Sequence, residues 1–388
     1  MSAPLPPLAG HHDVRRLLAA AYASGTLPQS ILLTGPRGIG KERLGLWLAQ
    51  LLVCENPGSE PCGACQPCRL VLRLEHPDIH WFFPLPRPDA SSPEKLREKL
   101  EDLRGAELQS WRENPFHQPE FEKVAAHYLA SVRTMQQLAS MRPALGRRKV
   151  FVVGDAELMV PQEASPEAAN AFLKLLEEPP PETTIVLTSS APGAMLPTIL
   201  SRVLTLRTGA VPERDILALL EAGAFPEKSA LARTSSLARG SVRRAILLAT
   251  AGGPEGTDPE RKAGRDLLIA ALSDGPVGRL ALAHGHRPAG ARAQLVGELE
   301  SLGEWLRDLL AVVTGADDHV TDASALPILR RMVERRDVDA QGVMAALARV
   351  EDSRDLALGN VNPQLIVSVL LAEMQTDLLG DRSMEISR

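Results

Sequence analysis

The 388-residue chain lacks a long apolar segment, and it has no excess of positive charge. Its longest apolar run, at 365–372, is far too short to cross a bilayer, which argues against a membrane protein. The formal net charge of -5 and the pI near 6.0 exclude a surface built throughout for nucleic acid. Any contact with DNA should therefore be local or shared, for example at the basic stripe 142–149. The first residues show no basic start followed by an apolar stretch, so we expect a cytoplasmic protein.

Cysteine is also scarce, and all four cysteines fall within fifteen residues, at Cys54, Cys62, Cys65 and Cys68. The spacing C-x₇-C-x₂-C-x₂-C brings four thiolates close enough to surround Zn²⁺ as a tetrahedron. Reduced cysteines or two disulfides are the alternatives, and neither explains the clustering. Four sulfur ligands leave no open position for water, so we predict a structural zinc site. His76 and His80 lie nearby, and we interpret them as solvated or packed histidines.

The segment 31–44 has the pattern of a phosphate-binding loop, with a strand, a glycine-rich turn and a helix start, but it lacks one residue of that pattern. Gly35, Gly38 and Gly40 allow the tight turn and the close approach of backbone to phosphates, and Lys41 supplies the positive charge. The hydroxyl residue that would hold Mg²⁺ is missing, because Glu42 stands in its place. A carboxylate directed toward phosphates costs Coulomb energy. The loop is thus a candidate nucleotide site in which we do not expect hydrolysis.

The acidic pair of an ATPase is incomplete as well. After the apolar strand predicted at 149–153, such an enzyme places an Asp for the magnesium shell and a Glu for the attacking water. Here the chain has Gly154, Asp155 and then Ala156. Either Gly154 replaces the magnesium ligand, or Asp155 fills that role without the following Glu. Asp155 is equally well explained as a turn or N-cap residue. Both registers of the motif weaken hydrolysis, in agreement with Glu42.

Bare apolar runs predict buried parallel strands at 31–34, 149–153 and 184–188, with helices between them. This alternation is typical of a doubly wound α/β domain. The segment 84–127 interrupts the rhythm, and we interpret it as an insertion with a helix near 93–103. After residue 210 the pattern becomes helical, and amphipathic helices are predicted near 295–310, 343–356 and 363–374. The expected divisions are 1–208 with the cysteine module 54–68 and the insertion, a helical part 209–252, a helical domain 260–378 and a tail 379–388.

Several ordered motifs resemble one family, the AAA+ clamp-loader subunits of bacterial DNA polymerase III, and most closely its delta-prime type. They are GPRGIGK at 35–41, the cysteine module, DAELM at 155–159, AANAFLKLLEEPP at 168–180, LPTILSR at 196–202, GSVR at 240–243 and NVNPQL at 360–365. The resemblance is good up to about residue 250 and thin between 255 and 340. It implies an α/β AAA+ P-loop NTPase-like domain with a parallel sheet and an inserted zinc module. It further implies a helical lid at 209–252 and a C-terminal helical collar for oligomerisation at 260–378.

The same resemblance assigns roles to two arginines. Arg202 matches an arginine that projects across a subunit interface into the ATP site of a neighbouring gamma or tau subunit, and Arg243 matches the sensor arginine of the lid. Two features depart from the family pattern. Val203 stands where the usual SRC motif has cysteine, and the segment 84–127 is longer than in the simplest members. That segment is either a partner contact or, in our preferred interpretation, a decorated surface loop.

The leading hypothesis is a scaffolding subunit, silent as an ATPase, that helps a clamp loader place the sliding clamp on primed DNA. Its partners would be gamma or tau and delta subunits, with clamp and DNA engaged through the assembled complex. The alternative is an active gamma/tau-type ATPase, in which Glu42 or a water molecule ligates Mg²⁺. A zinc-finger DNA-binding protein is a third possibility, but the acidic, proline-rich surroundings of the cysteines lack base-reading residues.

Overall fold

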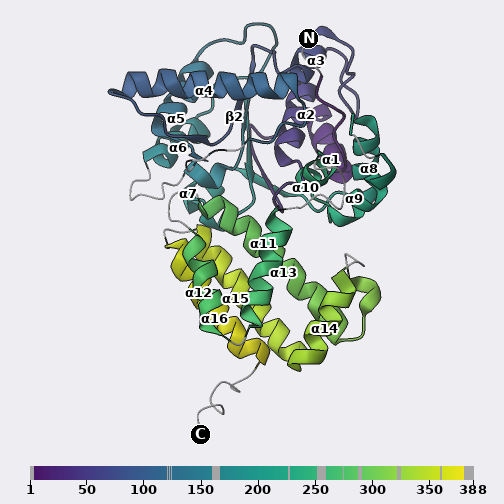
Figure 1. Cartoon of the computed structure of the whole chain (residues 1–388). Coiled ribbons are helices and arrows are strands. Elements are labelled where there is room, and N and C mark those ends of the chain that lie inside the picture. The colour runs from purple at the N-terminus through teal and green to yellow at the C-terminus, as the bar shows by residue number, and fades with distance from the viewer. Residues whose placement is uncertain are drawn as a thin grey trace. The chain divides into compact units, whose positions relative to one another are not determined.

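The computed structural model describes residues 4–119, 121, 123, 125–159, 167–225, 228–250, 259–273, 275–286, 291–320, 325–358 and 361–379. Two compact units make up the chain, Met1–Pro254 and Glu255–Arg388, and each is described by itself (Figure 1). Residues 251–258, where the expected helical part 209–252 ends, and residues 380–388 of the expected tail lie outside the described residues.

The first unit is built on a five-stranded sheet in the order β2-β5-β6-β1-β7, and every neighbouring pair in it is parallel. The strands are β1 (Ser30–Thr34), β2 (Ile79–Phe82), β5 (Lys149–Val153), β6 (Thr183–Ser189) and β7 (Leu204–Arg207). The three central strands and the parallel α/β class are as predicted. The two edge strands were not predicted, because each is only four residues long and neither is a continuous apolar run.

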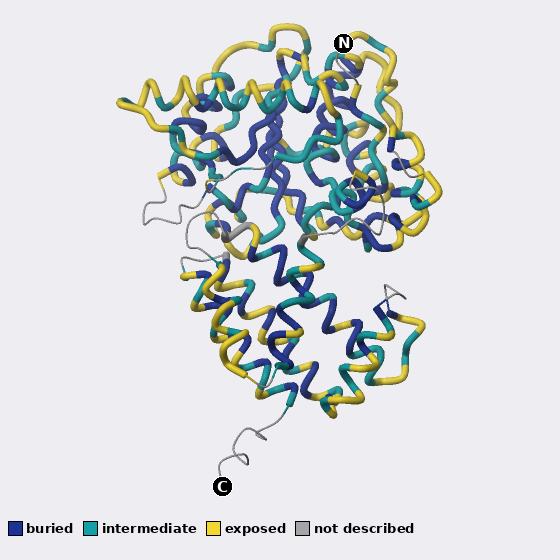
Figure 2. The backbone as a smooth tube through the Cα atoms, in the orientation of Figure 1, coloured by how far each residue is buried: buried dark blue, intermediate teal, exposed yellow. Residues whose placement is uncertain are grey.

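Apolar layers cover both faces of the sheet, and the buried strands form the dark centre of this unit in Figure 2. Side chains alternate between the faces, so Ile31 and Leu33 pack into one layer and Leu32 into the other. The first layer includes α1 (His12–Ala23), α2 (Lys41–Val53) and α4 (Pro93–Glu113); the second includes α5 (Leu129–Ser140), α6 (Glu167–Glu177) and α7 (Pro197–Leu200). Further short elements are α3 (Gln66–Leu72) and the 3₁₀ turns Ala156–Met159 and Pro192–Ala194.

The segment 84–127 differs from the surface loop that we expected. Its helix α4 runs ten residues beyond the predicted end and is capped by Ser92, whose hydroxyl accepts a hydrogen bond from the N–H of Lys95. The strands β3 (Leu85–Pro86) and β4 (Ala125–Ala126) pair antiparallel and close the segment at its base. Trp111 is buried and stacks on Trp81 with ring centroids 4.4 Å apart. Aromatic packing, which the polar composition concealed, therefore makes this segment part of the core.

Three helices complete the first unit: α8 (Glu213–Ala222), α9 (Leu231–Leu237) and α10 (Val242–Thr250), with a 3₁₀ turn at Lys228–Ala230. Their apolar residues form one cluster that also includes Ile39 of the glycine-rich loop, which is 1% exposed. Backbone bonds join this helical module to the sheet, since Val211 N–H donates to Gly240 O and Thr208 N–H donates to Thr34 O. The loop is consequently held between the sheet and the helical module.

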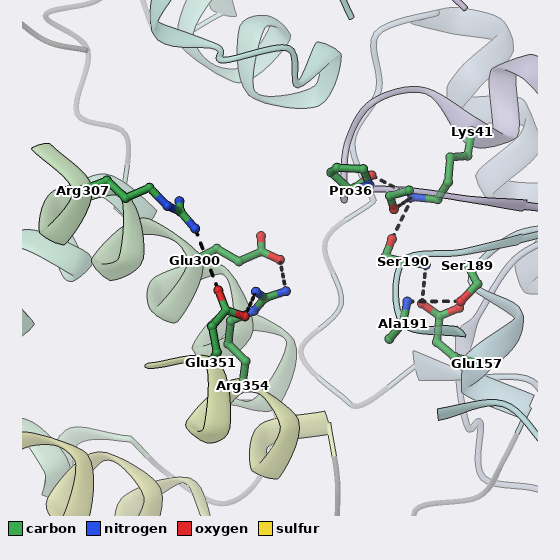
Figure 3. A network of polar contacts seen from close by, with 11 residues as sticks. Pro36, Lys41, Glu157, Ser189, Ser190, Ala191, Glu300, Arg307, Glu351 and Arg354 are labelled. Atoms are coloured by element: carbon green, nitrogen blue, oxygen red, sulfur yellow. Dashed lines mark hydrogen bonds and ion pairs between the residues drawn. The ribbon is translucent and has the colours of Figure 1, made fainter. Parts of the chain in front are cut away.

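The second unit consists of helices throughout its described residues. They are α11 (Pro259–Ala271), α12 (Pro276–Gly285), α13 (Ala291–Val313), α14 (Leu326–Arg336), α15 (Ala340–Leu358) and α16 (Pro363–Leu379), with a 3₁₀ turn at Asp317–His319. Leucines of α13 fill the centre of one apolar cluster with α11, α15 and α16. Glu351 joins Arg307 to Arg354, and Arg354 also reaches Glu300, in a surface network drawn in Figure 3. Among the helices described in the whole chain, none has the length and apolar character needed to cross a membrane.

Candidate functional site

The glycine-rich loop 35–40 lies where β1 ends and α2 begins, at the carboxyl edge of the parallel sheet. Gly38 has a φ of +78°, and a Cβ placed on it would lie 2.4 Å from Ser241 Oγ. A Cβ on Gly35 would lie 2.3 Å from the carbonyl oxygen of Thr208. Only glycine fits at either position, because the loop lies directly against the end of β7 and the start of α10. The predicted turn is present, and it is packed tightly by the chain itself.

Lys41 is buried, and its ammonium is directed back onto its own loop. The Nζ atom donates hydrogen bonds to Gly35 O at 3.0 Å, Pro36 O at 2.9 Å and Ser190 Oγ at 2.8 Å, as Figure 3 shows. An ammonium group has three donors, so all of them are used within the chain. Burial lowers the pKa of Lys41, while Asp155 and Glu157 raise it. A phosphate could gain this lysine only if bonds within the loop were broken.

Glu42 fills the space in which a magnesium ligand would be expected. Its Oε2 atom accepts a 2.7 Å hydrogen bond from Trp81 Nε1 and lies 2.5 Å from the position that a Cβ at Gly154 would take. Burial raises the pKa of this carboxyl to about 8, and the charge of Asp155 adds to the effect. The carboxyl therefore keeps its proton to a higher pH than an exposed glutamate does. The two departures noted in the sequence, at positions 42 and 154, are in contact in the structure. Only a glycine at position 154 leaves room for the carboxyl of Glu42.

The other two acidic residues at this edge are held by backbone contacts. Asp155 has a φ of +43°, its N–H donates to Thr188 Oγ1, and its carbonyl begins the turn that follows. These contacts agree with the interpretation of Asp155 as a turn residue. Glu157 accepts from the N–H of Ser190 at 2.9 Å, and burial raises its pKa. Sequence reasoning missed Glu157 and Ser190 as parts of the site, although polar residues that follow buried parallel strands are a usable signal.

Arg243 lies beside the loop. Its backbone N–H donates to Gly38 O at 2.9 Å, and its Cβ lies 3.0 Å from the Cβ position of Gly38. The structure thus brings Gly35, Gly38, Gly40, Lys41, Glu42, Asp155 and Arg243 to one edge of the sheet. His11, which was not predicted, joins them through a 2.8 Å contact between its Nε2 atom and Ile39 O.

Arg202 lies at the opposite edge of the same sheet. It follows α7 and precedes β7, whose first residue pairs with Ile31 near the start of β1. The guanidinium forms a 2.7 Å ion pair with Glu177 and donates to Thr198 O, and about a third of the side chain is exposed. Because parallel strands start at one edge and end at the other, Arg202 and the loop are separated by the length of the strands, about 13 Å for four residues. Arg202 cannot serve the loop of its own chain.

Cys54 directly follows α2, Cys62 lies in the connection to α3, Cys65 directly precedes α3 and Cys68 lies within it. Their Sγ atoms all lie within 4.8 Å of one another, and those of Cys62 and Cys68 are 3.9 Å apart. A zinc ion with Zn–S bonds of about 2.3 Å separates its ligands by about 3.8 Å, so the cluster has the size to hold such an ion. The N–H groups of Cys62 and Cys65 donate to Cys54 Sγ and Cys62 Sγ. These four residues can hold a metal ion.

The two neighbouring histidines take no part in that cluster. His76 is buried and accepts the N–H of Asp78 at Nδ1, while His80 packs on Phe151 with ring centroids 5.0 Å apart. Burial lowers the pKa of His80 to about 4, which keeps it neutral. Both are packed histidines, which is one of the roles expected from the sequence. Lys149 is likewise internal, so it does not belong to the basic stripe suggested at 142–149.

Comparison with known proteins agrees with this architecture. The family model described as DNA polymerase III, delta subunit, matches residues 10–211, just over half of the chain. The chain belongs to this family. Among relatives of the delta subunit family, DNA polymerase III subunit delta' of Bacillus subtilis strain 168 is 30% identical over 193 residues, or 50% of this chain and 46% of that protein. Subunit delta' of Escherichia coli K12 is 28% identical over 232 residues, or 60% and 57%.

The chain is also similar to a second type of subunit. DNA polymerase III subunit tau of Escherichia coli K12 is 28% identical over 245 residues, which are 62% of this chain and 31% of that protein. The chain spans about half the length of the delta' relatives that it matches. The matches establish the family of the first unit.

Proposed function

We propose that this chain is a delta-prime-type subunit of a DNA polymerase III clamp loader, which helps to place the sliding clamp on primed DNA during replication. Membership of the delta subunit family supports this proposal, as do the delta' relatives from several bacteria. The partners would be gamma or tau and delta subunits, with clamp and DNA engaged through the complex. A replication subunit of this kind would act in the cytoplasm.

The observation that carries the proposal is the closed state of the glycine-rich loop. Lys41 uses its three donors on the chain itself, and the carboxyl of Glu42 fills the space beside Gly154. Phosphoryl transfer needs a free lysine and a metal ion bridging the phosphates. Neither can be accommodated without rebuilding the loop. We therefore infer that this subunit does not hydrolyse ATP.

Arg202 would instead complete a catalytic site on a neighbouring subunit. An arginine supplied in trans stabilises the charge of the transferring phosphoryl group. Its position at the edge away from its own loop, with a third of the side chain exposed, supports this assignment. Glu177 would hold the guanidinium until the neighbour's phosphates compete for it. Arg243, next to the closed loop, would then have a structural role as the first turn of the lid.

We assign a single structural Zn²⁺ to Cys54, Cys62, Cys65 and Cys68. Four thiolates satisfy its tetrahedral preference and leave no position for a substrate. Bound there, the ion would fix the C-terminal end of α2 to α3. In the same scheme residues 209–252 form the lid and residues 260–378 the collar through which the subunit assembles.

The alternative is an active gamma/tau-type ATPase. It is favoured by the tau relative, whose match extends over 62% of this chain, and by the presence of Lys41 in the loop. In that case Glu42 or a water molecule would ligate Mg²⁺ and Asp155 would serve the chemistry. The hydrogen bond from Trp81 to Glu42 speaks against such a site.

ATP hydrolysis by the purified chain, alone and with gamma or tau, delta, clamp and primed DNA, tests the proposal. We expect no turnover by the chain alone and stimulated turnover after assembly. Turnover by the isolated chain that disappears in Lys41→Ala would establish the motor instead. If the chain is a scaffold that supplies no arginine in trans, the Arg202→Ala variant should stimulate turnover by the assembled complex as well as the unaltered chain does.

A further inference from the structure

Residues 141–148, called here the basic loop, connect α5 to β5 at the amino edge of the sheet. Two buried charged side chains hold this loop from inside. Asp78 is 1% exposed and its carboxylate accepts three consecutive backbone N–H groups, from Ala144 at 2.5 Å, Leu145 at 2.8 Å and Gly146 at 2.7 Å. Lys149 is 4% exposed, and its Nζ atom donates to the carbonyls of Leu138 and Met141.

Burying two charged side chains costs free energy. Their presence beneath the loop indicates that the order of the loop has a use. A buried charge loses its hydration, and here the loss is offset by bonds to backbone groups of the loop and of the end of α5, together with the attraction between Asp78 and Lys149. These bonds fix the conformation of an exposed segment and add no apolar core. Order imposed before binding lowers the entropic cost of making a contact. The construction therefore indicates a preformed contact surface.

The side chains on the outside of the basic loop are cationic and apolar. Arg142 and Arg147 are exposed, and within the described parts of the chain neither forms a hydrogen bond or an ion pair. Met141 is 52% and Leu145 is 46% exposed. Four neighbouring side chains without partners on a rigid loop, in a chain of net charge -5, make a local patch with a distinct chemical preference.

The basic loop shares its edge of the sheet with Arg202. It leads into β5, while Arg202 leads into β7, and three inter-strand steps separate these strands in the sheet. At about 4.8 Å for each step, the two features are about 14 Å apart across the edge. A single protein surface can reach both. The C-terminal end of α2 also lies here, since Val53 Cγ1 is 3.7 Å from the Cβ position of Gly146.

We propose that the basic loop is a second contact, beside Arg202, with the neighbouring P-loop subunit, where it docks on an acidic surface that also offers apolar side chains. This inference rests on the proposed function, because it takes the neighbour from the trans role of Arg202. A protein partner fits better than a DNA backbone. Phosphates would bind Arg142 and Arg147 but give nothing to Met141 and Leu145, whereas a protein surface satisfies both kinds of side chain.

The test uses the full chain and measures its dissociation constant for the gamma or tau subunit at low and at raised salt. Arg142→Ser combined with Arg147→Ser is expected to weaken binding about tenfold at low salt and to reduce the salt dependence. The matched control combines Arg16→Ser with Arg214→Ser, which removes the same charge from exposed positions on α1 and α8. It should leave the dissociation constant within about twofold. Leu145→Ser should weaken binding about threefold.

The outcomes separate this inference from the proposed function. Unchanged affinity in the loop variants, with turnover still dependent on Arg202, would overturn the basic loop contact and leave the trans arginine standing. Weakened affinity in the loop variants, with turnover independent of Arg202, would overturn the trans arginine and leave the basic loop contact standing. Unchanged subunit affinity combined with weaker binding of the assembled complex to primed DNA would assign the loop to DNA and overturn the inference. A chain that does not associate with gamma or tau at all would contradict both.

A second measurement tests the order of the loop without relying on assembly. Asp78→Asn removes the charge that holds the three N–H groups. Hydrogen exchange at Ala144, Leu145 and Gly146 should then accelerate at least tenfold relative to the strand amides of β5. Exchange at these amides that is already unprotected in the unaltered chain would contradict a preformed loop.

Discussion

The two edges of the central sheet are built in opposite ways. At the carboxyl edge Lys41, Glu42 and Glu157 all bond to groups of the same chain, and the helical module packs onto the loop. At the amino edge the chain presents an arginine that is one-third exposed and a basic loop whose cations have no partner among the described residues. The edge that binds nucleotide in an active enzyme is closed, and the edge away from it is open.

Under the proposed function, this difference explains how a P-loop fold would serve as a supporting subunit. Buried polar groups need partners, and once phosphates and Mg²⁺ no longer supply them, the chain must supply them itself. Ser190, Trp81 and the loop carbonyls do this at the carboxyl edge. The exposed cations Arg142 and Arg147 at the amino edge need no internal partners, because they remain in water.

The largest expected effect comes from the amino edge. Replacing Arg202 with Ala should lower ATP turnover by the assembled complex by about 10³-fold or more, because the charge of the transferring phosphoryl loses its stabilisation. Turnover is measured at saturating ATP, and the affinity of the subunit for gamma or tau should change little. Arg214→Ala, on exposed α8, is the control. Equal turnover in the two variants would contradict a catalytic role for Arg202 at the amino edge.

The cysteine module should give the next largest effect. Elemental analysis is expected to find about one zinc per chain, and Cys68→Ser should lower the free energy of unfolding by more than about 3 kcal/mol, because the metal and its tie between α2 and α3 are lost. Chemical denaturation of both proteins, with and without a chelator, checks this. Ser59→Ala, in the same segment but without a ligand atom, should behave as the unaltered chain. A folded protein free of zinc would contradict the assignment.

The closed edge can be broken by overpacking. Gly154→Asp places a side chain where the carboxyl of Glu42 lies and should cost about 1–3 kcal/mol of stability. Combined with Glu42→Thr, the same substitution should cost much less, so a double-mutant cycle should show coupling. Gly193→Asp serves as the control, since a Cβ there meets no atom within 4 Å. Additive effects at positions 42 and 154 would show that the two replacements are independent.

Counted for each pH unit, the smallest effect is a pH dependence of stability. The folded state raises the pKa of Glu42 from 4.5 to about 8, so folding takes up a proton between these pH values. The contribution of Glu42 to stability is complete below pH 4.5 and is lost as the pH rises through 8. Glu42→Gln should therefore become more stable than the unaltered chain, by about 1 kcal/mol for each pH unit across this window. Denaturation midpoints from pH 5 to 9 test this, with Glu98→Gln on the exposed face of α4 as control.

Local patterns predicted the parts of the fold that depend on few contacts. The central strands, the glycine-rich loop and the cysteine cluster were all visible as apolar runs or fixed spacings. The edge strands β2 and β7 were missed, because short strands with mixed polarity give no distinct pattern. The segment 84–127 was misjudged for a related reason. Trp111 is one residue in a polar helix, and its value to the core depends on Trp81, thirty residues earlier in the chain.

By itself the sequence determined the type of chain: a parallel α/β domain with an altered glycine-rich loop, four cysteines spaced to hold a metal ion and a helical C-terminal part. These properties follow from residue type and spacing over short distances. Tertiary structure decided that Glu42 occupies the room left by Gly154, that Lys41 is bonded to Ser190, and that Arg202 and the basic loop share one edge. Such relations join residues far apart in the chain, and they depend on the order of strands in the sheet, which no local pattern specifies.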